Sequence, residues 1–297
     1  DEARFRTPAI ATAGVRRAPT SLVGSLRAGR RRTPGQWGGG PGAAVVRGIT
    51  GLLGLSLLVA GCSGPAGPNG REASGRPLVV FAAASLTDVL ERLADDFEEA
   101  TGVPVLLNLA GSQTLATQLV EGAPADVFVA ADTVQMGVVA EADLLADAPV
   151  VVATNTLTIV VEDGNPRGVV GLADLARRDL VVVLPAAQVP AGRYAREVLA
   201  RAAVDVRPAS LERSVRAALA RVAQGEADAS IVYASDVVAA RGTVTGVEIP
   251  VEQNVVATYP MAVLAGAPRP DAAAAFTAFL TSDAAQTVLR TSGFKTP

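Results

Sequence analysis

The sequence predicts an α/β fold in which helices cover parallel sheets. From Arg76 onward, short apolar segments typical of buried strands alternate with segments of helical periodicity. The composition agrees, because the chain is 49% hydrophobic but only 4% aromatic. Such a core is built mainly from Ala, Val and Leu, whose small volumes let helices lie close to a sheet. A length of 297 residues leaves room for two lobes of ordinary size.

The N-terminal segment reads as an export and anchoring signal. Residues 1–46 are rich in Arg, Gly and Pro without apolar periodicity, and we expect them to be disordered or absent from the mature protein. Arg47 and the apolar run 49–60 have the charge and length of a secretory signal, too short to span a bilayer stably. The run ends before Cys62 in a sequence that resembles the bacterial lipobox. We therefore expect residues 1–61 to be removed and Cys62 to carry lipid, with 62–75 as a flexible tether; the alternative is a chance cysteine after a short core helix.

Charge and missing residue types exclude several functions. Residues 1–61 hold nine arginines against Asp1 and Glu2, whereas 62–297 hold 17 basic and 27 acidic residues, an excess of ten acids. Nucleic-acid binding needs a basic surface, so this body should not bind nucleic acid. There is no His, which excludes Ser-His-Asp catalysis and His-ligated metals. Lys295, the sole lysine, follows no glycine-rich loop, which excludes a Walker A motif.

The elements after Arg76 follow from the apolar pattern. We expect the first strand at 78–83 to lead into a helix from Leu86 to about Thr101. A strand at 103–109 then precedes a short helix at 115–121. Further strands are expected at 127–130, 157–161, 180–184 and 231–233, and further helices at 191–203 and 214–224.

Two serines stand where strands turn into helices. Ser85 lies before the first helix with Asp88 three residues later, as in a capping box, and Ser112 lies similarly before the second helix. One interpretation is that both hydroxyls only cap helices. The other is that they face a common cleft with unpaired backbone amides, since helix N-termini attract oxyanions and ligands bind at the carboxyl ends of strands.

Four motifs together resemble the periplasmic molybdate-binding proteins. They are Phe81-Ala-Ala-Ala-Ser-Leu, Gly122-Ala-Pro-Ala-Asp-Val-Phe, Val189-Pro-Ala-Gly and Ile231-Val-Tyr-Ala-Ser-Asp, in order and with similar gaps between about Leu78 and Phe294. The resemblance implies a two-lobed type II periplasmic-binding fold, each lobe a mixed, mainly parallel sheet flanked by helices. We expect one lobe from 76–154 plus 243–297 and the other from 155–242.

The resemblance also implies a ligand and its donors. Molybdate or tungstate would be held between the lobes by Ser85 and Ser112 on one side, and by the amides of Ala191 and Val215 with the Tyr233 hydroxyl on the other. The local sequence fits, because Pro190 marks a helix start and Val215 opens a helix, leaving amides unpaired. Without the resemblance, Tyr233 would read as a core tyrosine with a satisfied hydroxyl.

These five positions supply donors and no carboxylate, which favours a fully ionised tetrahedral dianion over protonated phosphate. Molybdenum would be present only within the bound oxyanion, without a direct protein ligand, and no cofactor is expected. The expected function is capture of the anion outside the cytoplasmic membrane, on its outer face, as a monomer that delivers it to the permease of an ABC importer.

Four alternative functions can be compared with this one. A receptor for sulfate or another oxyanion would use the same donors. A hydrolase using Ser85 and Asp88 lacks a group that could activate the hydroxyl. A ligand-sensing transcription factor would need a helix-turn-helix, which 1–46 does not resemble. A ferric-ion binder would cluster its tyrosines, which are dispersed here.

Overall fold

A computed structural model describes residues 75–297, which lie within the compact unit Ala66–Pro297. The expectations for residues 1–61 and for Cys62 fall outside the described part. The strands are β1 (Leu78–Ala83), β2 (Val105–Ala110), β3 (Val127–Val129), β4 (Val150–Glu162), β5 (Val183–Pro185), β6 (Ser210–Glu212), β7 (Ala229–Tyr233), β8 (Val244–Glu248) and β9 (Val256–Val263). The helices are η1 (Ala84–Leu86), α1 (Thr87–Thr101), α2 (Ser112–Val120), α3 (Thr133–Glu141), η2 (Leu172–Ala176), α4 (Pro190–Arg201), α5 (Val215–Ala223), α6 (Ala234–Ala239), α7 (Pro270–Leu280) and α8 (Asp283–Thr291).

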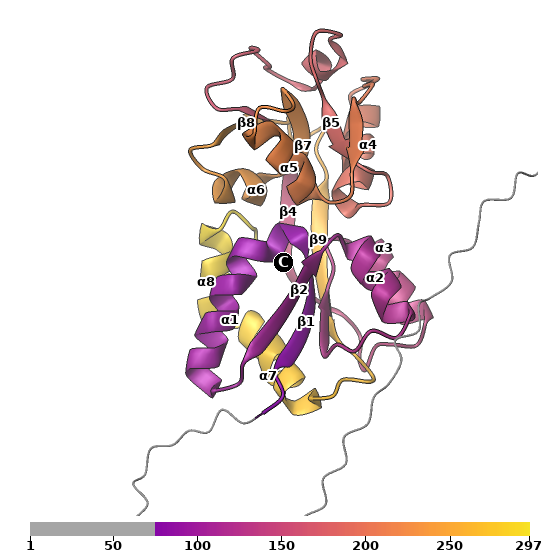
Figure 1. Ribbon diagram of the computed structural model, residues 1–297, viewed down its shortest axis with the longest axis vertical. Coiled ribbons are helices and arrows are strands. Elements are labelled where there is room, and N and C mark those ends of the chain that lie inside the picture. The colour runs from indigo at the N-terminus through magenta and orange to yellow at the C-terminus, as the bar shows by residue number, and fades with distance from the viewer. Residues whose placement is uncertain (1–74) are drawn as a thin grey trace, which may run out of the picture. The chain divides into compact units, whose positions relative to one another are not determined.

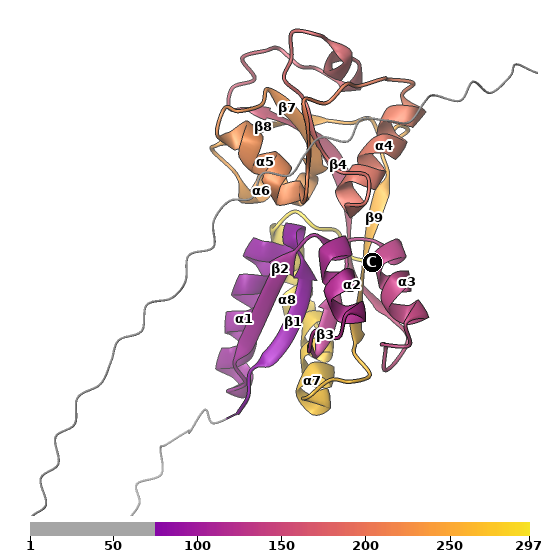
Figure 2. The same ribbon diagram turned by 45° about the vertical axis from the view of Figure 1, so that its right-hand side comes forward.

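In the first lobe a sheet is covered by helices on both faces (Figures 1 and 2). Strands β2, β1 and β3 run parallel, and β9 pairs antiparallel with β3. On one face α1 packs against α7, with the rings of Phe97 and Phe276 edge to face at 5.1 Å. On the other face Phe81 and Phe128 pack with residues of α2 and α3. Burial on both faces explains why β1 and β3 are apolar at every position.

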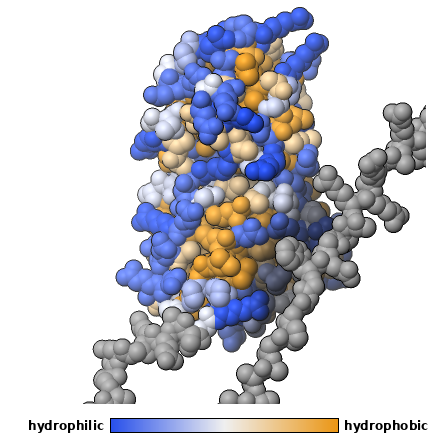
Figure 3. Space-filling model, in the orientation of Figure 1, coloured by the Kyte–Doolittle hydropathy of each residue, from blue (hydrophilic) through white to orange (hydrophobic). Residues whose placement is uncertain are grey.

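The edge of this sheet is less covered. Strand β2 lies at the end of the strand order, and Leu106 on it is 55% exposed. Figure 3 shows hydrophobic residues gathered over this part of the first lobe.

Two long strands join the lobes, as Figure 1 shows for β4 and β9. They pair antiparallel from Val150↔Met261 to Thr156↔Val256, after which β4 continues and pairs with β7 and β8. The expectation of mainly parallel pairing therefore describes β1, β2 and β3 but not β4 and β9. The physical reason is that β4 leaves the first lobe and β9 returns to it, so these two neighbouring strands run in opposite directions. The resulting sheet is mixed, as expected.

The strand pairing bears on the lobe boundaries. Strand β8 pairs with Thr158–Glu162 of β4, beside β7, rather than with the strands of the first lobe. We propose that the first lobe comprises 76–154 and the segment from β9 to Pro297, and that the return crossing is at β9 rather than near Thr243. The central strand of the second lobe is then β4, flanked by β7 and β8.

Most element positions agree with the sequence. The predicted strand at 78–83 is confirmed, and α4 and α5 begin within one residue of the expected starts. Helix α2 begins at Ser112, three residues earlier than expected, because Gly111 rather than Ser112 occupies its N-cap. Helix α3 and the C-terminal helices α7 and α8 were not expected from the sequence. Among the described residues, no helix is long and apolar enough to cross a membrane.

Candidate functional site

The five residues singled out from the sequence lie around one cavity. Ser85 and Ser112 contribute from the first lobe, and Ala191, Val215 and Tyr233 from the second. We call it the interlobe cavity; its complete lining is Ala83, Ala84, Ser85, Gly111, Ser112, Ala131, Val189, Pro190, Ala191, Val215 and Tyr233. No side chain in this lining carries a charge.

The interlobe cavity is small and enclosed by buried residues. Its volume is about 10 Å³, which leaves no room for a sugar or a peptide. Each of the five predicted residues is at most 4% exposed. A ligand held here would be a compact ion contacted from both lobes.

Neither serine caps a helix. The N-cap of α1 is Leu86 and that of α2 is Gly111, and neither makes a side-chain cap. Ser85 lies in a turn of 3-10 helix, η1, directly ahead of α1, and its Oγ contacts the Tyr259 hydroxyl instead. The interpretation of Ser85 and Ser112 as mere caps is therefore wrong.

Each hydroxyl instead has a partner that leaves its proton available. The Ser112 Oγ accepts the Ala131 amide proton at 3.0 Å, so the Ser112 hydroxyl hydrogen is free to point at a ligand. The Ser85 Oγ lies 3.0 Å from the Tyr259 hydroxyl. Burial raises the pKa of Tyr259 far above its usual range, so Tyr259 stays protonated and can donate to Ser85. Ser85 can then direct its own hydrogen into the cavity.

Tyr233 brings a buried hydroxyl without a partner. Its oxygen makes no hydrogen bond to any of the described residues, although the side chain is 1% exposed. Leaving such a group unsatisfied costs about 1–3 kcal/mol, which a ligand oxygen would recover. Burial raises the pKa of Tyr233 well above its usual value, so the phenol remains a donor. Its ring is fixed against Tyr259, with ring centroids 5.8 Å apart.

Helix starts supply the remaining donors. Ser112 and Val215 are the first residues of α2 and α5, and Ala191 is the second residue of α4, after Pro190. First-turn amides have no carbonyl acceptor within their own helix, and the helix dipole adds positive potential at that end. The interlobe cavity therefore combines hydroxyl and amide donors with no nearby acceptor carboxylate in its wall.

Sequence reasoning missed Ala131, which lines the cavity, and Tyr259, which is hydrogen-bonded to Ser85. Tyr259 comes 174 residues after Ser85, within the apolar strand β9, and no local signal marks it as a neighbour of that serine. Ala131 follows β3 at the carboxyl end of the sheet, a position at which ligand-binding residues are common and which could have marked it as a candidate.

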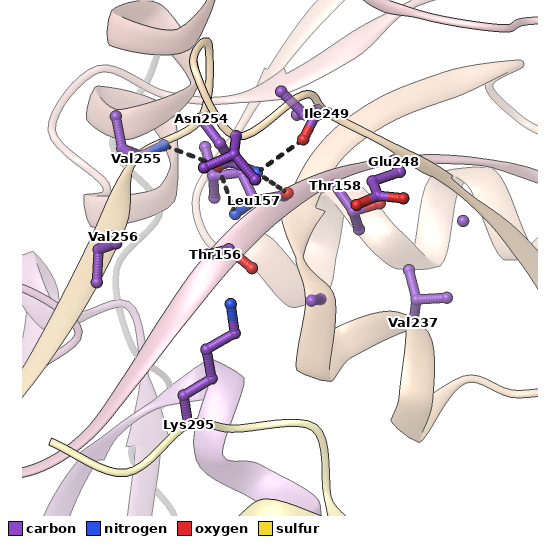
Figure 4. A pocket seen from close by; sticks show the side chains of 13 residues that line it. Thr156, Leu157, Thr158, Val237, Glu248, Ile249, Asn254, Val255, Val256 and Lys295 are labelled. Atoms are coloured by element: carbon purple, nitrogen blue, oxygen red, sulfur yellow. Dashed lines mark hydrogen bonds between the residues drawn. The ribbon is translucent and has the colours of Figure 1, made fainter.

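A second, larger cavity lies at the crossing strands and has different chemistry. This hinge cavity has a volume of about 470 Å³ and is lined by residues of β4, β8, β9 and α6, with Lys295. Figure 4 shows Lys295 entering from the C-terminal segment and Glu248 from β8. The Glu248 carboxylate would repel a dianion, and the Asn254 amide already donates to the Leu157 carbonyl at 2.8 Å. The donors of the interlobe cavity therefore suit an oxyanion better.

A buried carboxylate stands behind the second-lobe side of the site. Asp236 accepts the Tyr233 amide proton at 3.0 Å and lies 3.1 Å from the Arg216 Nε, without hydrogen-bond geometry. Burial raises the pKa of Asp236 to about 7, although Arg216 opposes the shift. Between about pH 4 and 7 the native protein thus holds a proton that the unfolded chain has lost.

This proton predicts a pH dependence of stability. Because the unfolded state binds fewer protons in that range, the contribution of Asp236 to the free energy of unfolding falls as pH rises, by up to about 1.4 kcal/mol per pH unit. Asp236→Asn should remove that slope, so the variant should gain stability relative to wild type from pH 5 to pH 7.5. Urea unfolding at pH 5 and pH 7.5 measures the free energy of unfolding of both proteins. An equal change with pH in wild type and Asp236→Asn would contradict the interpretation of Asp236 as a buried acid.

Comparison with known proteins places the chain in a family. A family model described as bacterial extracellular solute-binding protein matches residues 78–295. The chain belongs to this family. Its members are solute-binding proteins rather than enzymes, which agrees with the expectation from the sequence. In the described residues no three His, Cys, Asp or Glu side chains form a potential metal site.

Individual relatives agree with the resemblance drawn from the motifs. The molybdate-binding protein ModA of Mycobacterium tuberculosis is 41% identical over 251 residues, covering 84% of this chain and 96% of the relative. ModA of Haemophilus influenzae is 34% identical over 235 residues, covering 75% and 91%. The resemblance to molybdate-binding proteins is thereby confirmed.

Solved structures confirm the periplasmic-binding fold. The periplasmic molybdate-binding protein of Azotobacter vinelandii superposes with a TM-score of 0.66 at 21% identity, covering 74% of this chain and 99% of that one. The sulfate-binding protein SubI of Mycobacterium tuberculosis gives 0.64 at 22% identity, covering 75% and 87%.

Proposed function

We propose that this extracytoplasmic solute-binding protein captures molybdate or tungstate in the interlobe cavity and delivers it to the permease of an ABC importer. The observation that carries the proposal is a small, buried cavity whose polar wall consists of neutral hydroxyl and amide donors. The relatives named molybdate-binding proteins support the choice of ligand.

The donors suit a fully ionised tetrahedral anion. Ser85, Ser112 and Tyr233 would donate through hydroxyls, and the first-turn amides of Ala191 and Val215 through backbone N–H groups. Hydrogen bonds to a charged acceptor contribute roughly 1.5–3 kcal/mol each, so about five to seven of them exceed the cost of ordering a small ion. Phosphate that carries a proton would need an acceptor, and no carboxylate lines the cavity.

Selection among dianions would depend on cavity size. Sulfate presents the same charge and the same four acceptor oxygens, but its bonds are shorter than those of molybdate. A cavity matched to the larger ion would leave some donors too far from sulfate oxygens, and each lost bond lowers affinity. A sulfate receptor is therefore the alternative function, favoured by the likeness to a sulfate-binding protein of the same fold.

Calorimetric titration of the purified chain with molybdate, tungstate, sulfate and phosphate tests the function. We expect one site that binds molybdate and tungstate at least about a hundredfold more tightly than sulfate, with phosphate weaker still, a difference of about 2.7 kcal/mol or more. Preference for sulfate would select the alternative, and the absence of heat with every oxyanion would refute the proposal.

We further propose that the protein acts as a monomer anchored through lipid on Cys62. The support is the order of apolar run, small residues, lone cysteine and polar tether in the sequence. Cys62→Ser should move the protein from the membrane fraction to the soluble extracytoplasmic fraction, as immunoblots of fractionated cells would show. A variant that stays with the membrane would contradict the anchor, and light scattering at the mass of a dimer would contradict the monomer.

A further inference from the structure

Two arginines of the second lobe reach acids of the first. Arg216 on α5 forms an ion pair with Asp88 on α1. Arg193 on α4 pairs with Asp132, the N-cap of α3, at 2.6 Å. These partners are 128 and 61 residues apart in the sequence.

In each ion pair, both the arginine and the acid are close in sequence to a residue that lines the interlobe cavity. Arg216 follows the lining residue Val215, and Asp88 lies one turn after Ser85. In the other pair the neighbours are likewise lining residues, since Arg193 comes two residues after Ala191 and Asp132 directly follows Ala131. Each pair therefore connects the two lobes next to the segments that would hold the anion.

Contacts within each lobe hold Asp132 and Arg216 in position for their partners in the other lobe. Asp132 is fully buried and accepts the Gln135 amide proton at 2.7 Å, which fixes its carboxylate. Arg216 lies 3.1 Å from the buried Asp236 of its own lobe, which keeps the guanidinium near the cavity. Because Asp88 is half exposed and Asp132 is not, the Arg193–Asp132 pair is the stronger of the two.

Entry and release of an anion require these contacts to break. The cavity is lined by residues of both lobes and these residues are buried, so separation of the lobes would widen the path of an ion into and out of it. Separation parts Arg216 from Asp88 and Arg193 from Asp132.

On the basis of the proposed function, we propose that Arg193 and Arg216 are positioning residues that latch the closed lobes and set the rate at which the bound anion is released. They touch no atom of the cavity themselves. The ion pairs are formed without a bound anion, and their effect on affinity comes mainly through the dissociation rate, because release requires the closed lobes to separate.

The test compares three variants of the full chain. Arg193→Gln and Asp88→Asn each remove one latch, and Glu226→Gln is the matched control. Glu226 pairs with Arg221, which lies on α5 as Arg216 does, but both members of this pair belong to the second lobe. The side chains of Glu226 and Asp88 are exposed to a similar extent. Binding and release of radiolabelled molybdate are timed, with excess unlabelled molybdate to start release.

We expect release to be about tenfold faster in Arg193→Gln and two- to fivefold faster in Asp88→Asn. Association should change less than twofold, and Glu226→Gln should match wild type. A purely structural role would lower the melting temperature of the anion-free and anion-loaded proteins equally; a latch lowers that of the loaded protein more. Unchanged release rates in both latch variants would overturn the proposal while leaving the proposed function intact.

A second measurement needs no ligand and separates the two proposals. Small-angle X-ray scattering of anion-free protein should give a larger radius of gyration for the Arg193→Gln, Asp88→Asn double variant than for Glu226→Gln. Equal radii would overturn the latches. Failure of wild type to bind molybdate, with a difference in radii, would refute the proposed function alone.

Discussion

Replacing Gly192 by alanine is expected to destabilise the protein by at least about 2–3 kcal/mol and to abolish tight anion binding. A Cβ at Gly192 would lie 2.0 Å from the Ala186 carbonyl oxygen and 2.3 Å from that of Pro185. Both atoms belong to the backbone, so no side-chain rotation relieves the clash, and the start of α4 must move. The Ala191 amide, one residue earlier in that helix, moves with it.

The matched control is Gly137→Ala. Gly137 also lies within a helix, α3, but an added Cβ there meets no atom within 4 Å. Alanine should therefore raise the free energy of unfolding by about 0.5–1 kcal/mol, since it lowers the entropy of the unfolded chain. Urea unfolding and molybdate titration of both variants measure the contrast. A Gly192→Ala protein as stable and as tightly binding as wild type would mean that α4 does not need to approach residues 185–186 so closely.

The second large effect is expected from the two serines. Ser85→Ala and Ser112→Ala should each weaken molybdate binding about ten- to a hundredfold, corresponding to roughly 1.5–3 kcal/mol for a hydrogen bond to a charged acceptor. Some stability is lost too, because the Tyr259 hydroxyl and the Ala131 amide lose their partners. Titration calorimetry and thermal melts separate the two losses.

Ser282→Ala provides the control for a genuine helix cap. The Ser282 Oγ accepts the Ala285 amide proton at the start of α8, and Ser282 does not line the interlobe cavity. This variant should lose about 1 kcal/mol of stability and keep wild-type affinity. If Ser85→Ala and Ser112→Ala behaved in the same way, the anion would have to bind elsewhere.

Local sequence signals account for much of the fold. Pro190 marks the start of α4, and the apolar segment at 78–83 forms a strand buried on both faces. The antiparallel return through β9 has no such signal, because alternating strands and helices describe parallel units and say nothing about a long strand that leaves a lobe. The Ala-rich segment of α7 shows only weak helical periodicity, whereas α8 has a clear amphipathic pattern and could have been predicted.

The candidate site divides in the same way. Local features mark the turns at Ser85 and Ser112 and the helix starts at Ala191 and Val215. The resemblance based on the four motifs indicated that these residues belong to one site. What the sequence does not contain is pairing across large separations. Tyr259 reaches Ser85 because β9 returns to the first lobe, and Arg216 reaches Asp88 because the two lobes meet, so both contacts emerge only from the three-dimensional structure.

The most direct test of the central claim is the position of molybdenum in crystals grown with sodium molybdate, located by anomalous diffraction on both sides of the molybdenum absorption edge. We expect one dominant molybdenum peak in the interlobe cavity. Its position should place the oxygens of the anion within hydrogen-bonding distance of Ser85, Ser112 and Tyr233. A dominant peak in the hinge cavity between Glu248 and Lys295, with the interlobe cavity empty, would contradict it.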